Sequence, residues 1–144
     1  VRKRIGRLET KNAYLVGKIT DAEKVWLYRH CEAFLFPSMG EGFGLPAIEA
    51  MQFGRAVFIA NYTCLPEICG DCATVWQSLQ PDDMAAVIQK SLPGFYDEAE
   101  RLEKIRQHTK DFSYEKHIAA YLALYKELLL THDTKQDRTQ IEKK

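Results

Sequence analysis

Short apolar runs alternate with amphipathic stretches along most of the chain. Helical spacing of apolar residues predicts helices over 21–31, 46–53, 81–92 and 114–130, and a mostly solvated helix within the charged stretch 95–112. Segment 61–72 fits a loop or a short helical turn. Short apolar runs predict a buried strand at 13–17 (AYLVG) and further strands at 33–38 (AFLFPS), 56–60 (AVFIA) and 73–76 (ATVW).

Side chains at the segment ends fix several of these boundaries. Thr20 precedes the first helix, and Glu23 stands three residues later, the spacing of a capping box. Pro46 suits the first position of a helix, and Gly54 suits its exit. Ser113 is placed to cap the last helix, whose apolar stripe needs a surface to lie on.

Alternation of apolar runs with helical segments is typical of βαβ units with a parallel sheet. The predicted fold is therefore α/β, a three-layer α/β/α Rossmann-like sheet. Ligands of such sheets bind beyond the carboxyl ends of the strands. A glycine loop follows the run at 33–38, so its position alone marks it as the candidate site.

Composition fits a single globular domain. The chain has 144 residues, 46% hydrophobic and 28% charged, with a formal net charge of zero. We expect residues 1–130 to form the domain and the polar stretch 131–144 to be a disordered tail. A neutral chain argues against a nucleic-acid reader that works by charge alone. We found no apolar run long enough to span a membrane and no signal-peptide pattern.

Four cysteines raise one alternative. Cys64, Cys69 and Cys72 have the Cys-x4-Cys-x2-Cys spacing that plant-type ferredoxins use for an iron–sulfur cluster. The fourth ligand should follow this trio, but Cys31 precedes it. Free thiols in a reduced cytoplasm are the simpler interpretation, and we expect neither a cluster nor a structural zinc.

The loop GEGFGLPAIEA, residues 40–50, combines three glycines, a helix start and two acids. Glycines let a backbone approach a ligand closely, and a helix N-terminus attracts anions, phosphate above all. Carboxylates repel phosphate, so Glu41 and Glu49 should face sugar hydroxyls instead. A nucleotide sugar has both chemistries. The simpler alternative is that both acids merely favour the positive end of the helix.

The segment FPSMGEGFGLPAIEAMQFGRAV, residues 36–57, resembles the signature of retaining nucleotide-sugar glycosyltransferases with two Rossmann-like domains, the GT-B fold, family 4 in particular. The Glu-x7-Glu motif of that family falls on Glu41 and Glu49. Residues 65–71 (LPEICGD) resemble its PE-x-x-G turn, and residues 15–38 resemble the stretch upstream. Ala56 departs from the family pattern, which often has proline there.

The resemblance implies a role for each matched residue. Glu41 would contact the hydroxyls of the donor sugar beside the reacting carbon, as an electrostatic and positioning residue. Glu49 would bind the ribose hydroxyls. The other donor-binding positions would be the loop residues Ser38, Gly42, Phe43, Gly44 and Leu45, with Gly17, Lys18 and Ile19 against the base. The reaction would be transfer of a hexose from a UDP- or GDP-sugar, with no metal and with retained anomeric configuration.

The same comparison implies that parts of a complete enzyme lie outside this chain. The family grips the diphosphate with an Arg and a Lys from a first βαβ unit. The stretch 6–12 (GRLETKN) mimics that motif, but the run at 13–17 follows too soon for the intervening helix and strand. We therefore expect the donor-binding part of a glycosyltransferase whose N-terminal acceptor domain is missing, and a fragment that is inactive alone.

Partners, location and alternatives follow from this interpretation. The full-length parent would be cytoplasmic, associated peripherally with the inner membrane face, and would act in polysaccharide biosynthesis. One alternative is a degenerate, non-catalytic domain that serves as a partner or regulatory module, and unpaired apolar edges would favour a dimer of the fragment. Another is a two-domain epimerase, a class that lacks this glycine–glutamate spacing.

Overall fold

The sheet has three parallel strands in the order β1-β2-β3. The computed structural model describes residues 12–141, with side chains described through residue 130. The strands are β1 (Ala33–Phe36), β2 (Ala56–Ala60) and β3 (Thr74–Trp76). Ala33 pairs with Ala56, and Phe58 pairs with Thr74. All five residues of the central strand β2 are buried, which explains why its sequence is apolar throughout.

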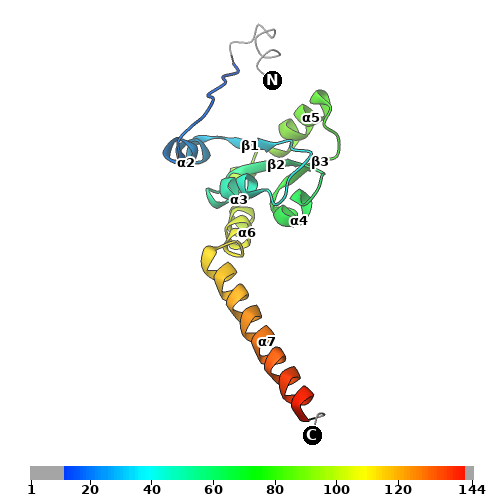
Figure 1. Ribbon diagram of the computed structural model, residues 1–144. Coiled ribbons are helices and arrows are strands. Elements are labelled where there is room, and N and C mark those ends of the chain that lie inside the picture. Colours follow the sequence, from blue (N-terminus) through cyan, green and yellow to red (C-terminus); the bar gives the residue numbers. More distant parts are fainter. Residues whose placement is uncertain (1–11, 142–144) are drawn as a thin grey trace.

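Helices connect and cover these strands (Figure 1). They are α2 (Asp21–His30), α3 (Leu45–Gln52), α4 (Leu65–Cys69), α5 (Pro81–Ser91), α6 (Ala99–Lys110) and α7 (Tyr114–Ile141). Short 3-10 turns lie at Gly70–Cys72 and Phe95–Asp97. Helices α3, α4 and α6 lie on one side of the sheet and α5 on the other, as an α/β/α arrangement requires (Figure 1).

The core is built where β2 meets α3, α4 and β3. Its largest fully buried side chains include Trp76, Phe58, Ile48 and Met51. The Phe58 and Trp76 rings stack with centroids 5.7 Å apart. The indole N–H of Trp76 donates to the carbonyl of Met84 at 3.3 Å, which ties β3 to α5. Helix α3, which follows the glycine loop, is therefore fixed to the sheet by its buried residues Ile48 and Met51.

The predicted strand at 13–17 does not form, and this expectation was wrong. Residues 13–19 have no regular secondary structure, and Tyr14 and Val16 are exposed. A strand needs a neighbour for its backbone groups, and among the described residues this segment has none.

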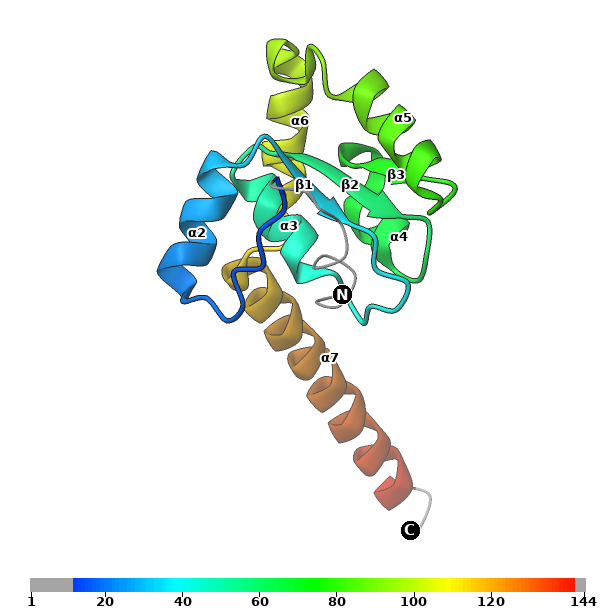
Figure 2. The same cartoon turned by 90° about the horizontal axis from the view of Figure 1, so that it is seen from above.

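Helix α7 extends away from the sheet and helices (Figures 1 and 2). Its residues 114–130 are all exposed, including Tyr114 and Leu130. The helix continues to Ile141, past residue 130 where the sequence pattern predicted its end. Residues 131–141 contain neither proline nor glycine, so nothing in the sequence stops the helix there. In the described part of the chain, no helix is both long and apolar enough to cross a membrane.

Candidate functional site

The glycine loop connects the carboxyl end of β1 to the first turn of α3. Gly44 is the N-cap of α3 and adopts a left-handed conformation, with φ 90° and ψ 31°. No side chain caps this helix N-terminus. Pro46 occupies the second helical position, one later than predicted, and has no amide proton to satisfy. The positive end of α3 is therefore left without a capping side chain. It lies at the carboxyl ends of the strands, where ligands of this fold class bind.

The three glycines of the loop have different roles. A Cβ placed on Gly44 would lie 2.6 Å from Cδ2 of Leu65, and its φ is positive, so this position requires glycine for packing and backbone reasons. Gly40 and Gly42 do not have positive φ, and an added Cβ would meet nothing within 4 Å. Of the three loop glycines, only Gly44 adopts a backbone conformation that favours glycine. Open space surrounds the other two.

Glu41 is oriented from within its own loop. The Ser38 hydroxyl donates to Oε1 of Glu41 at 2.7 Å. The thiol of Cys64, just before α4, donates to the Glu41 backbone carbonyl at 3.5 Å. The structure therefore brings the side chains of Ser38 and Glu41 together.

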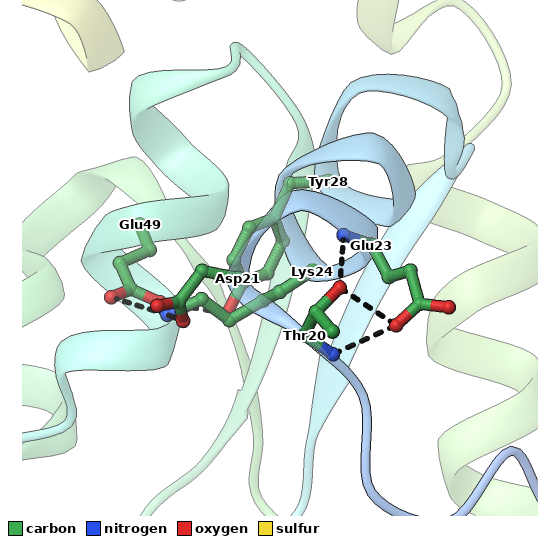
Figure 3. Close-up of polar contacts among 6 residues, drawn as sticks. All are labelled: Thr20, Asp21, Glu23, Lys24, Tyr28 and Glu49. Atoms are coloured by element: carbon green, nitrogen blue, oxygen red, sulfur yellow. Dashed lines mark hydrogen bonds and ion pairs between the residues drawn. The ribbon is translucent and has the colours of Figure 1, made fainter.

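Glu49 belongs to a second group, formed with helix α2 (Figure 3). The Lys24 ammonium donates to Oε1 of Glu49 at 3.2 Å, and the Tyr28 hydroxyl donates to Oε2 at 3.0 Å. The Glu49 side chain keeps 35% of its surface exposed. Glu41 and Glu49 thus have separate hydrogen-bond partners on separate elements, and Glu49 does not point freely into solvent.

Tyr28 joins this group from the core side. It is 7% exposed, and its ring lies edge-on to Phe34 and stacked on Phe53. Burial, followed by the hydrogen bond to Glu49, raises the pKa of Tyr28 well above its usual value. The hydroxyl therefore stays protonated at neutral pH and can donate to Glu49.

Phe43 and Leu45 line a mostly apolar cavity of about 270 Å³ between the loop and the start of α7. Its other walls are Phe112, Ser113, Tyr114 and His117. The Phe43 and Phe112 rings meet edge-on with centroids 5.9 Å apart. The Phe43 ring thus lies against the α6–α7 junction, and Gly42 in the same loop is exposed.

Gly17, Lys18 and Ile19 lie in the irregular segment before α2. Gly17 has φ +69°, a conformation that favours glycine. Lys18 and Ile19 line a cavity of about 360 Å³ together with Glu23, Trp26 and Leu27 of α2. The three residues are therefore next to α2. Ile19 also lines a second cavity, of about 370 Å³, together with Lys24 and Tyr28 of α2 and Pro46 in the first turn of α3.

Lys24 and Tyr28 are the residues that sequence reasoning missed. The sequence pattern predicted the helix that contains them, but no role for either side chain. A signal was present, because a lysine and a tyrosine four residues apart lie on one face of a helix. Their partner Glu49 is 25 residues from Lys24, so no local pattern indicated the contact.

The cysteines do not form the cluster that their spacing allowed. All four are free, and Cys69 and Cys72 are buried. Within the part of the chain that the structure describes, no group of three His, Cys, Asp or Glu side chains is arranged to hold a metal ion. Burial raises the pKa of the Cys69 thiol to about 11, so it stays protonated.

A parallel α/β sheet with a glycine loop and an uncapped helix N-terminus at the carboxyl end of a strand is typical of nucleotide-binding α/β domains. The family model "Glycosyl transferases group 1" matches residues 2–127. The chain therefore belongs to this family, which confirms the resemblance found in its sequence.

Curated relatives agree with the family. The chain is 38% identical over 85 residues to the Serotype-specific mannosyltransferase WbdA of Escherichia coli, which covers 59% of this chain and 10% of that protein. It is 40% identical over 77 residues to the O-antigen chain mannosyltransferase B of Escherichia coli, covering 54% and 20%. It is 29% identical over 119 residues to the MMP alpha-(1->4)-mannosyltransferase of Mycolicibacterium hassiacum, covering 77% and 28%. The chain thus spans at most 28% of these three proteins.

A solved structure gives the same fold. The sucrose-phosphate synthase of Thermosynechococcus elongatus superimposes with a TM-score of 0.75 at 23% identity, over 90% of this chain and 35% of that one. At this identity the likeness shows the fold alone, a GT-B Rossmann-like domain.

Proposed function

We propose that this chain is the donor-binding part of a retaining glycosyltransferase that moves a sugar from a nucleotide diphosphate sugar to a glycan or lipid-linked acceptor. The observation that carries the proposal is the start of α3, where an uncapped helix N-terminus follows a glycine loop, with Glu41 before it in the loop and Glu49 within the helix. Positive helix ends attract phosphate, and carboxylates accept hydrogen bonds from sugar hydroxyls.

Each loop residue then has a proposed role. Backbone N–H groups around Phe43, Gly44 and Leu45 hold the distal phosphate and sugar, and Gly42 leaves room for their approach. Glu41, oriented by Ser38, accepts hydrogen bonds from the donor sugar. Glu49 accepts them from the ribose, and the segment 17–19 lies against the base.

The sugar proposed is mannose, because three relatives are named mannosyltransferases. In the proposed reaction, the bond between the anomeric carbon and the diphosphate oxygen breaks while the acceptor oxygen bonds to the same face. The acceptor proton passes to the leaving diphosphate. The helix N-terminus and basic side chains stabilise the charge that develops on that group, so the proposal includes no metal.

This chain alone is proposed to bind donor weakly and not to transfer sugar. Holding both reactants in position contributes up to about 7–11 kcal/mol to catalysis in ideal cases, and acceptor positioning belongs to the other domain of a GT-B enzyme. Incubation of the pure chain with a labelled nucleotide sugar and a mannoside acceptor tests this point. Sustained transfer well above the rate without protein would contradict it.

Two glutamine variants test the donor assignment. We expect Glu41→Gln to weaken binding of GDP-mannose and UDP-glucose while leaving GDP and UDP unaffected, because Glu41 contacts only the sugar. Glu49→Gln should weaken all four ligands by about tenfold, because each contains ribose. Glu115→Gln, which changes an exposed acid on α7, is the matched control. Equal affinities in all variants, measured by NMR titration, would refute the assignment.

A further inference from the structure

Helix α2 presents two donors to one carboxylate of α3. Lys24 and Tyr28 are one helical turn apart, and each bonds a different oxygen of Glu49, at 3.2 Å and 3.0 Å. A carboxylate bonded at both oxygens cannot rotate without losing one of these contacts. Figure 3 shows both side chains reaching from α2 toward Glu49.

The Tyr28 hydroxyl is a fixed donor rather than a mobile one. Its ring is held between Phe34 of β1, at 5.5 Å, and Phe53 at the end of α3, at 5.9 Å. The side chain is 7% exposed, so it cannot take another rotamer without leaving the core. Through the Tyr28 hydroxyl, Oε2 of Glu49 is therefore held in a fixed position relative to strand β1.

Lys24 supplies the second contact at the surface. Its side chain is 39% exposed, and its ammonium also lies 3.9 Å from the fully exposed Asp21. Ion pairs this exposed contribute little to folding stability. We therefore expect Lys24 to affect the orientation of Glu49 rather than the folding stability of the protein.

Glu49 retains capacity for a ligand. An ionised carboxylate has about four lone-pair sites, and two accept from Lys24 and Tyr28. The side chain is 35% exposed. The remaining sites suit two hydroxyls on neighbouring carbons, which a ribose offers and a dideoxyribose does not.

We infer that Lys24 and Tyr28 are positioning residues that fix the Glu49 carboxylate for the two ribose hydroxyls of the donor nucleotide. The inference rests on the proposed function, which assigns the ribose to Glu49. The competing explanation is that both residues only fasten α2 to α3. A fastening role would change the binding of every nucleotide alike, whereas a positioning role changes the preference for ribose.

The test compares GDP with 2′,3′-dideoxy-GDP, and UDP with its dideoxy analogue, by NMR titration of the whole chain. We expect the unmodified protein to bind the ribonucleotides about tenfold more tightly, since the lost hydrogen bonds are to a charged group. Tyr28→Phe keeps the ring and removes the hydroxyl, and should lower this preference at least about threefold. Lys24→Met should act in the same direction, and Lys24→Arg should restore part of it.

Tyr96→Phe is the matched control, because it deletes another tyrosine hydroxyl, one that donates to the carbonyl of Glu32 and accepts from the amide of Ala56 rather than bonding Glu49. It should leave the ribose preference unchanged. If Tyr28→Phe fails to fold, the Lys24 variants decide the question, because Lys24 is not in the core.

The outcomes separate the two proposals. A preference that falls in the Tyr28 and Lys24 variants but not in Tyr96→Phe supports positioning. If the Tyr28 and Lys24 variants keep the full preference for ribonucleotides over dideoxynucleotides, this inference is overturned, whether or not the affinities for all nucleotides fall together. The proposed donor site would not be affected by that result. No preference in the unmodified protein would overturn the ribose assignment of Glu49, and the inference with it.

Discussion

Replacement of Gly44 by alanine tests how the loop is held at the start of α3. An added Cβ would lie 2.6 Å from Leu65 Cδ2, and Leu65 is fully buried, so the clash cannot be relieved into solvent. Alanine at φ 90° costs about 1–2 kcal/mol, and overpacking in a core costs about 1–3 kcal/mol. Together these terms predict a loss of about 2–5 kcal/mol in the free energy of unfolding.

Urea denaturation followed by tryptophan fluorescence measures this loss, since Trp76 is buried and becomes exposed on unfolding. With an m-value of about 2 kcal/mol/M, the midpoint should fall by about 1–2.5 M. Gly42→Ala is the control within the same loop, because an added Cβ there meets nothing within 4 Å. It should change stability by less than about 0.5 kcal/mol. Equal effects of the two substitutions, or no loss in Gly44→Ala, would refute the reasoning.

Four further predictions use the same structure. Gly42→Ala should weaken nucleotide-sugar binding by about threefold or more at unchanged stability, and unchanged affinity in an NMR titration would contradict a close approach of the donor at this position. Thr20→Ala should lower the free energy of unfolding by about 1 kcal/mol, because it removes the capping box of α2; a urea midpoint equal to that of the unmodified protein would refute this. The Cys69 thiol, with its pKa raised to about 11 by burial, should resist iodoacetamide at pH 8 while the half-buried Cys64 reacts, and mass spectrometry showing equal labelling would contradict it. Since the unfolded thiol releases its proton first, its contribution to stability should be lost between pH 9 and about 11, a loss absent from Cys69→Ala.

Features coded by neighbouring residues were predictable from the sequence. The capping box at Thr20 and Glu23 forms as predicted, with both reciprocal hydrogen bonds present. The central strand β2 and the exit of α3 at Gly54, with φ +66°, also follow the sequence pattern. In each of these cases a few adjacent side chains determine the local conformation, so the pattern contains the necessary information.

Features that depend on distant residues were not predictable. The run at 13–17 has the composition of a strand, but pairing depends on a neighbour that the described residues do not supply. The difference between Gly42 and Gly44 arises from Leu65, which is far along the chain. The partners of Glu49 come from another helix. Sequence located the candidate site, whereas the groups that orient its acids required the structure.

The most direct test of the donor site is an amide NMR titration of the chain with GDP-mannose and UDP-glucose. The account predicts that at least one of them shifts the amide resonances of residues 41–49 at millimolar concentration, while those of α5, on the other side of the sheet, stay in place (Figure 1). If both ligands leave residues 41–49 unmoved at that concentration, or shift only residues elsewhere, the loop before α3 is not a nucleotide-sugar site.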